Sequence, residues 1–262
     1  MGRYLRLLAL ELRVSFAMSM QYRWNFLVDG IVTVLSTAIG LIPLVIAFRG
    51  RPPVAGWTFE SALVVVGWFT LLKGVLDGAV NPSLITVVEH IRTGTLDFVL
   101  MKPADAQFLV STAKFEPWKV VDVAAALGIF GWAFAQMGRA PHASHVALAL
   151  LLLVCAAAAL YSVWILVIAA AFWVVRLDNL VYLFDAIFDF SRWPVSVFKG
   201  ALRFVFTFVI PLGLMTTYPA QALLGVLDGW TAVASVLGAA AFAALARVVW
   251  TRALGRYTSA SS

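Results

Sequence analysis

Charged residues are scarce in this sequence. Asp, Glu, Lys and Arg make up 12% of its 262 residues, whereas apolar and aromatic residues make up 63%. Soluble domains carry about 25% charged residues, so this composition excludes an ordinary soluble domain. The apolar residues come in uninterrupted blocks rather than in alternating or heptad patterns, and we therefore expect the blocks to cross a membrane as helices.

Cysteine is almost absent, since the single thiol is that of Cys155, inside the apolar run 151–160. An intramolecular disulfide and a cysteine metal cluster are thereby excluded. Two histidines, His142 and His145, could reach one ion from a helix. Two ligands with no Cys, Asp or Glu beside them make a poor site, so we expect no metal.

Nucleotide-binding and catalytic motifs are also missing from the sequence. It contains no Gly-x-x-x-x-Gly-Lys-Ser/Thr loop, which would cradle the phosphates of ATP, so we expect no cofactor on this chain. The lack of a His-Glu-x-x-His segment or of a Ser, His and Asp set on the apolar blocks argues against an intramembrane enzyme acting on lipid. Lys and Arg are spread between the blocks, so the net charge of +6 does not indicate a nucleic acid partner.

The apolar blocks predict an all-α integral membrane protein with about six transmembrane helices in a single domain, residues 1–262. Between the fourth and last blocks, Leu180 to Phe190 and Phe204 to Met215 are both apolar, and only one of them can cross completely if both termini share a side. The other spans are expected at Phe26 to Phe48, Ser61 to Val80, Lys119 to Met137, within Val146 to Val175, and Trp230 to Trp250. We expect Asn81 and Pro82 to break the second helix.

Residues 1–24 precede the first span. Leu5, Leu8, Leu12 and Phe16 recur at spacings of three and four, which indicates a helix lying in the membrane interface. The alternative is a cytoplasmic extension that continues into the first span. Glu11 and Arg13 interrupt the apolar stretch too early for a signal peptide.

Lys and Arg predict the orientation. An inside amino terminus places most of them on the cytoplasmic side, so we expect both termini to be cytoplasmic. Arg192, Lys199 and Arg203 are exceptions if the segment 191–228 is external. Treating Phe204 to Leu224 as the fifth span would remove that conflict.

Ionisable residues within or beside the apolar blocks are functional candidates. Lys73 and Asp77 are one helical turn apart and can neutralise each other. We expect an ion-pair network at the outer mouth of the spans, with a proton or substrate relay as the alternative. Gly74 and Gly78 form a small-xxx-small pattern that permits close helix packing. The expected network comprises Lys73, Asp77, Asp122, Asp185, Asp189 and Arg192.

The longest polar stretch, residues 81–118, contains a distinctive segment: residues 89–103 read EHIRTGTLDFVLMKP. Gly94 can cap the helix before it and Pro103 can end the element after it. This segment resembles the pattern that permeases of type-two ABC transporters carry between their second and third spans. A second likeness is the sequence FSRWP at 190–194, followed by the prolines at 211 and 219, which resembles the family's outer re-entrant segment, here 191–228.

The resemblance covers most of the chain and points to a bacterial branch in which permease and ATPase are separate chains. It implies a cytoplasmic coupling helix that sits in a cleft of the ATPase, and an ordinary solvated loop is the alternative. The residues it assigns to that contact are Glu89, His90, Arg92, Thr93, Gly94 and Asp97.

The implied function is export across the bacterial cytoplasmic (inner) membrane. The implied partners are two ATPase subunits, which would bind ATP and Mg, and a second permease subunit, identical or similar. The alternative is a secondary transporter driven by an ion gradient, which would use the intramembrane Asp residues and broken helices.

Overall fold

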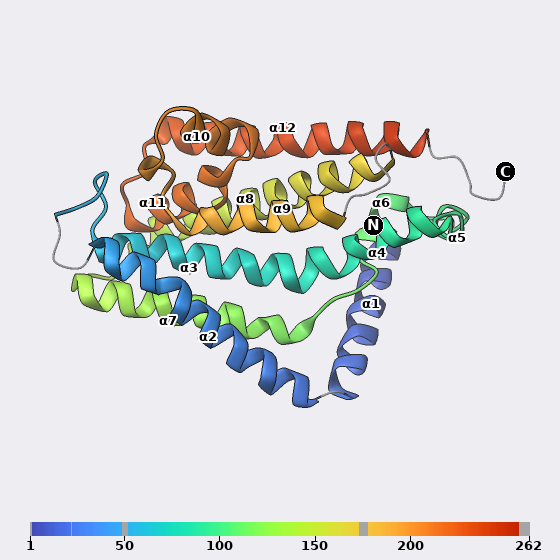
Figure 1. The fold of residues 1–262 in the computed structure, drawn as a ribbon, viewed down its shortest axis with the longest axis horizontal. Coiled ribbons are helices and arrows are strands. Elements are labelled where there is room, and N and C mark those ends of the chain that lie inside the picture. The colour runs from blue at the N-terminus through green and yellow to red at the C-terminus, as the bar shows by residue number, and fades with distance from the viewer. Residues whose placement is uncertain (1, 22, 49–51, 173–177, 257–262) are drawn as a thin grey trace.

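The computed structural model describes residues 2–21, 23–48, 52–172 and 178–256 of the chain. Within these ranges every named element is helical, as the sequence predicted (Figure 1). The helices that run along the main axis of the molecule are α2 (Arg23–Phe48), α3 (Phe59–Val75), α7 (Val120–Met137), α8 (Ala143–Ala169), α9 (Asp178–Asp189) and α12 (Gly229–Leu254).

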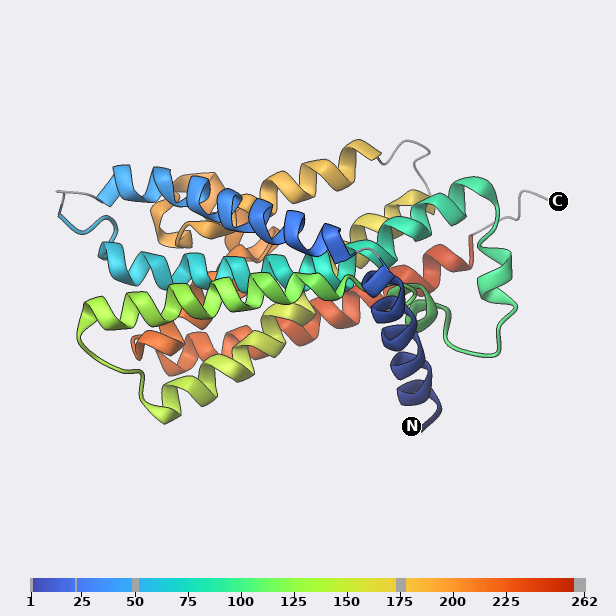
Figure 2. The same ribbon diagram turned by 90° about the horizontal axis from the view of Figure 1, so that it is seen from below.

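These helices form an antiparallel bundle. The helices α2, α3, α7, α8, α9 and α12 alternate in direction along the chain, so the connections collect at the two ends of the bundle (Figures 1 and 2). In the described residues, five helices are long and apolar enough to cross a membrane, or up to six if a bent pair counts as one. The multi-pass helical membrane fold is therefore confirmed.

One end of the bundle carries the polar stretch 81–118, which is predicted to couple the chain to an ATPase and which we call the coupling region. Here lie α4 (Asn81–Thr93), α5 (Asp97–Leu100) and α6 (Ala106–Ser111), together with the end of α12 (Figure 1). Helix α1 (Gly2–Gln21) starts in the same half and runs across the direction of the long helices (Figure 2). A helix in this orientation can lie flat in the membrane interface while the bundle crosses the bilayer.

The opposite end carries a bent helical pair. Helix α9 brings the chain to this end, and α12 takes it back (Figure 1). Between them the segments Gly200–Val209 and Gly213–Leu224 meet at 70°, at Pro211. They comprise α10 (Gly200–Phe204), π-helical turns at Val205–Val209 and Gly213–Thr217, and α11 (Tyr218–Leu224).

Buried hydroxyl groups fix this bent pair to the end of α9. The hydroxyl of Thr216 donates to the carbonyl oxygen of Ser191 at 2.6 Å, and the N–H of Val195 donates to the Thr217 hydroxyl at 3.0 Å. Both threonines are buried. Since these bonds satisfy backbone groups that a broken helix leaves free, the segment can stay folded in apolar surroundings.

The expected helix break at Asn81 and Pro82 is wrong. The chain remains helical from Phe59 to Ile91, because a π-helical turn at Leu76–Val80 leads directly into α4. Pro82 has no N–H to bond the carbonyl oxygen of Gly78 four residues earlier. That oxygen accepts the N–H of Glu116 at 2.8 Å instead. A partner from another segment thus replaces the missing helical bond. As a result, α3, the π-helical turn and α4 form one continuous helix.

Glycines bring α3 and α7 together. A Cβ atom on Gly74 would lie 2.7 Å from Cβ of Asp122, and one on Gly78 would lie 3.0 Å from Cβ of Lys119. A Cβ on Gly67 would overlap the ring of Phe130. The small-xxx-small pattern therefore serves packing, and it also brings Asp122 of α7 and Lys119, just before α7, against α3 and the turn that follows it.

Candidate functional site

The coupling region is built around a sharp turn after α4. Gly94 adopts a left-handed conformation, with φ of 71°, and caps α4. Such a φ is unfavourable for residues with a Cβ, so glycine is the residue that can turn the chain here. The turn leads into the four-residue helix α5, at the far end of the bundle (Figure 1).

The residues predicted for the ATPase contact gather at this turn. Glu89 and Thr93 are exposed on the last turns of α4, and Asp97 opens α5. His90 lies between them, its Nδ1 2.7 Å from the hydroxyl oxygen of Thr95. The side chain of Arg92 lies outside the described part of the chain.

The sequence did not lead us to predict two exposed apolar side chains at this turn. Phe98 is 66% exposed and Met101 is 70% exposed, although they lie in the most polar stretch of the sequence. Exposed apolar side chains at the tip of a polar segment are typical of a contact surface. Their signal in the sequence was the short apolar run between Asp97 and Lys102.

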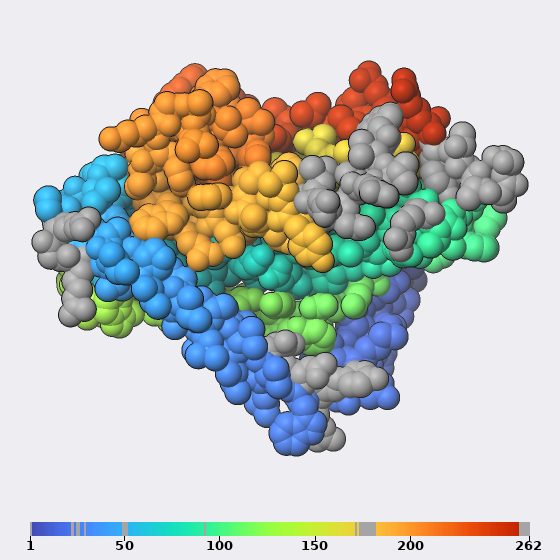
Figure 3. Space-filling model, in the orientation of Figure 1, coloured from blue at the N-terminus to red at the C-terminus, as the bar shows by residue number. Residues whose placement is uncertain are grey.

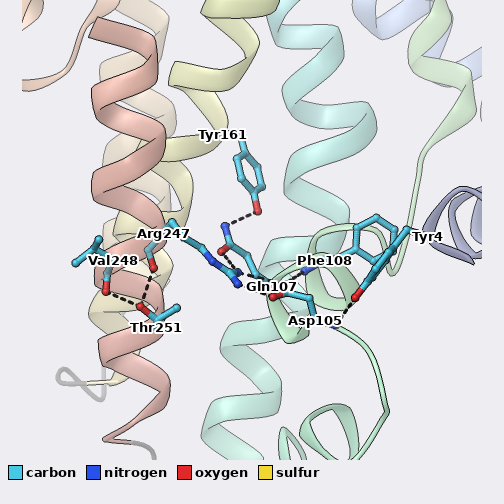
Figure 4. Close-up of polar contacts among 8 residues, drawn as sticks. All are labelled: Tyr4, Asp105, Gln107, Phe108, Tyr161, Arg247, Val248 and Thr251. Carbon is cyan, nitrogen blue, oxygen red and sulfur yellow. Dashed lines mark hydrogen bonds and ion pairs between the residues drawn. The ribbon is translucent and has the colours of Figure 1, made fainter. Parts of the chain in front are cut away.

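An ion pair ties the coupling region to the last span (Figure 4). Nη2 of Arg247, on α12, lies 2.6 Å from Oδ2 of Asp105, and Nη1 lies 3.2 Å from Oδ1. Asp105 also caps α6, because its carboxylate accepts the N–H of Phe108 at 3.0 Å. The hydrogen bond from Arg247 lowers the pKa of Asp105 below its ordinary value of 3.8.

The same network reaches α8. Arg247 donates to Oε1 of Gln107 at 2.8 Å, and Nε2 of Gln107 donates to the Tyr161 hydroxyl at 3.0 Å. Ser111, at the end of α6, lies 2.7 Å from the same hydroxyl. Three side chains from α6 and the preceding turn therefore bind partners on α8 and α12. Figure 4 shows two of them, Asp105 and Gln107.

Helix α1 binds the other side of the coupling region. The Tyr4 hydroxyl accepts the N–H of Asp105 at 3.2 Å, and its ring meets the ring of Phe108 edge-on at 4.8 Å (Figure 4). Farther along α1, Ser15 accepts the N–H of Phe115 at 3.1 Å. These contacts join residues about 100 positions apart in sequence, which no local pattern reveals.

A second group of polar residues lies inside the bundle, and we call it the charged cluster: Lys73, Asp77, Lys119, Asp122, Asp185, Asp189 and Arg192. Lys73 donates to Oδ1 of Asp185 at 3.3 Å and lies 3.7 Å from Asp77. The ammonium of Lys119 lies 3.7 Å from Asp77 and 3.8 Å from Asp122. The six predicted residues come together, and Lys119 joins them because Gly78 lets α7 start against α3.

Arg192 closes one end of the cluster. It lies 3.2 Å from the carboxylate of Asp189, and its guanidinium carbon is 4.9 Å from the centre of the Phe69 ring. It also reaches over Gly40 of α2, where a Cβ would lie 2.9 Å from its Nη1.

The placement of the cluster at the outer mouth of the spans stays a prediction. The cluster runs along α3 from Phe69 to Asp77, towards the end that carries α4. Phe69 is ten residues into α3, about 15 Å from the end of the helix at the α2–α3 connection.

All residues of the cluster except Asp185 line a cavity of about 250 Å³ between α2, α3, the start of α7 and the end of α9. In Figure 3, α3 and α7 are visible at the bottom of the hollow between α2 and α9. Thr33, Ser36 and Thr37 of α2 line one wall, and Thr70 of α3 lies opposite. Asp122 is only 5% exposed, and its Oδ2 has no hydrogen-bond partner in the described residues.

No group of three or more His, Cys, Asp or Glu residues in the described ranges has an arrangement suited to a metal ion. His142 and His145 stand with ring centres 6.0 Å apart at the start of α8. The cavity is lined by side chains of both charges.

The chain matches the model of a known protein family. The model of the family described as ABC-2 family transporter protein matches residues 34–261, from the middle of α2 beyond the end of α12. No match was found among curated proteins or solved structures.

Proposed function

Because this chain belongs to the ABC-2 family of transporter proteins, as the membrane-spanning permease subunit of an ABC transporter, we propose that ATP hydrolysis on a separate chain drives it through the coupling region. The tip around Gly94, α5 and Met101 is the docking element. It would take the place in an ATPase cleft that the family's coupling helix takes, with contacts from Glu89, His90, Arg92, Thr93, Gly94 and Asp97.

The position of α5 is the observation that carries this proposal. It projects from one end of the bundle and exposes Phe98 and Met101 next to polar Thr93. An apolar centre with a polar rim is the usual composition of a protein interface. The tip is therefore better suited to binding in a groove of another protein than to full exposure to water.

The links behind the tip support a mechanical role. Helix α4 continues α3 as one helix, with a π-helical turn between them. Arg247 binds Asp105 to α12, and Tyr4 binds Asp105 to α1. A push on α5 would reach three membrane elements through bonded contacts. Coupling through such a contiguous network needs no contact between the ATPase and the spans themselves.

The remaining parts of the proposal follow from the family. Two ATPase subunits, with their ATP and Mg, would bind two permease chains, identical or similar, at the cytoplasmic end of the bundle. In a bacterial inner membrane, that orientation puts both termini in the cytoplasm. The segment 191–228, which contains the bent pair, then lies on the outer side. Transport would run outwards, as export.

Site-directed cross-linking tests the docking element. Cys155 is the chain's one cysteine and is buried, so a Cys155→Ala background allows single thiols to be placed at will. Met101→Cys should cross-link to the co-expressed ATPase, with a yield that changes when ATP is added. Val226→Cys, exposed at the opposite end, is the matched control and should give no such product.

Transport by the purified chain without any nucleotide-hydrolysing partner would contradict the proposal and favour an ion-driven transporter. Equal cross-linking from Met101→Cys and Val226→Cys would show that the tip is not the specific contact site for the ATPase.

A further inference from the structure

We propose that the bent pair binds the phosphate group of an anionic phospholipid, in a pocket beside Arg203. The inference goes beyond ATPase coupling, since binding needs neither nucleotide nor a partner chain. It starts from Arg203, which the proposed orientation places on the outer side, against the positive-inside tendency.

Arg203 is a cation without an acidic partner. Arg192 pairs with Asp189 at 3.2 Å, but the guanidinium of Arg203 forms no ion pair with any described residue. It lies on α10, in an otherwise apolar run. A cation beside lipid is costly without a counter-ion. The phosphate of a lipid headgroup can supply that charge and accept two N–H groups from one guanidinium.

Arg203 lines a pocket of about 430 Å³ between the two segments of the bent pair and the turn at Val195–Val197. This volume falls in the range of about 300–1,000 Å³ that is usual for small-molecule sites. Among the described residues that line the pocket, Arg203 is the one that carries a charge. The sign of the lining therefore favours an anion.

Neutral groups of the lining can donate hydrogen bonds to an anion. The indole N–H of Trp57 donates to the hydroxyl oxygen of Ser196 at 2.9 Å, which leaves the hydroxyl hydrogen of Ser196 free to donate. Tyr218 and Gln221 are half-buried, and their side chains form no hydrogen bond with any described residue. Three such donors beside a guanidinium suit the several acceptor oxygens of a phosphate.

Two apolar rings beside Arg203 suit the acyl chains of a lipid. Phe204 is 60% exposed and Phe208 is 66% exposed, and their ring centres lie 5.2 Å apart. Both rings also line the pocket. Exposed apolar surface in a membrane protein is suited to contact with lipid. The rings therefore favour a phospholipid over a soluble phosphate ester as the occupant.

The lining favours an anionic headgroup over one that carries an amine. No carboxylate of the described residues lines the pocket, so an ammonium group would find no counter-ion there. Asp228, at the start of α12, is used as a cap, since it accepts the N–H of Thr231 at 2.8 Å. Lys199, exposed at the start of α10, adds a second cation. Basic pockets of this kind bind anionic headgroups.

Native mass spectrometry of the purified full chain tests the site. The chain, in detergent, is titrated with equal amounts of phosphatidylglycerol, which has no amine, and phosphatidylcholine, and the bound lipids are counted. We expect one phosphatidylglycerol to bind in preference to phosphatidylcholine. Arg203→Gln should lower its affinity by at least about tenfold, the size expected for a hydrogen bond to a charged group.

Arg139→Gln is the matched control. Arg139 is an exposed arginine of the α7–α8 connection, which lies at the same end of the bundle (Figure 2) but outside the pocket. Binding of phosphatidylglycerol by this variant should equal that of the wild type. Equal losses in Arg139→Gln and Arg203→Gln would show that any exposed arginine at this end attracts the lipid, and would overturn the proposal.

Two further results would overturn it: equal binding of the two lipids, or unchanged phosphatidylglycerol binding by Arg203→Gln. Glycerol 1-phosphate, which has the phosphate but no acyl chains, distinguishes the source of the anion. No displacement of phosphatidylglycerol by an equal concentration of this compound supports the lipid. Displacement would mean that the occupant is a soluble phosphate ester and that the lipid assignment is wrong.

Discussion

The imidazole ring of His145, at the start of α8, packs directly on the Cα of Gly225, the residue that caps α11. A Cβ at position 225 would lie 2.6 Å from Nδ1 of His145, and the glycine has φ of 73°. This contact seats the end of the bent pair against the α7–α8 connection. His145 therefore has a packing role, which an interpretation of the two histidines as metal ligands would miss.

Gly225→Ala should therefore lower the thermal midpoint of the purified protein. It combines left-handed strain, worth about 1–2 kcal/mol, with the clash against His145. Gly200→Ala is the matched control, since Gly200 also has positive φ, of 56°, but no atoms lie within 4 Å of its Cβ position. A midpoint for Gly225→Ala no lower than that for Gly200→Ala would show that the ring contact is unimportant.

Gly74→Ala should separate α3 from α7. The new methyl group would meet Cβ of Asp122, and overpacking of this kind costs about 1–3 kcal/mol. Gly131→Ala, on α7 with open space around it, should be neutral or slightly stabilising. Thermal unfolding of both variants in the same detergent measures the difference, and equal midpoints would contradict the close approach.

Gly94→Val should uncouple nucleotide hydrolysis from transport while the chain still inserts and assembles. A β-branched residue is strained at φ of 71°, so the turn into α5 would change direction. Gly94→Asn should keep most activity, because Asn tolerates this conformation. The measurement is transport per ATP hydrolysed in reconstituted vesicles, and wild-type coupling in Gly94→Val would argue against the docking element.

The Asp105–Arg247 pair should stabilise the protein by about 1 kcal/mol or less, because both side chains are partly exposed. A double-mutant cycle with Asp105→Asn and Arg247→Gln isolates this interaction, since Asn preserves the cap on α6. Additive effects of the two changes on unfolding would show that the pair contributes nothing.

Low pH should abolish the difference in thermal stability between the wild type and Asp105→Asn. Since Arg247 holds the folded pKa of Asp105 below 3.8, the stabilisation is fully present above that value. It is lost as the pH falls through the lowered folded pKa. Thermal midpoints of wild type and Asp105→Asn should therefore differ at neutral pH and converge below pH 3.8. A gap that persists there would mean that Asp105 acts through packing alone.

Local information in the sequence determined the helical membrane fold and the approximate limits of most spans. An apolar block of about 20 residues must be helical in a bilayer, because no water is available to bond its backbone. The turn at Gly94 was predictable for a similar reason, since only the local φ decides which residue fits there.

Only the tertiary structure decided how these pieces meet. Pro82 reads as a helix break until Glu116 is seen to bond the free carbonyl oxygen of Gly78. Lys119 enters the charged cluster, and Arg247 meets Asp105, through contacts between distant segments. Hydrogen bonds and ion pairs across the bundle depend on helix packing in three dimensions, and residue order along the chain does not encode that packing in any short pattern.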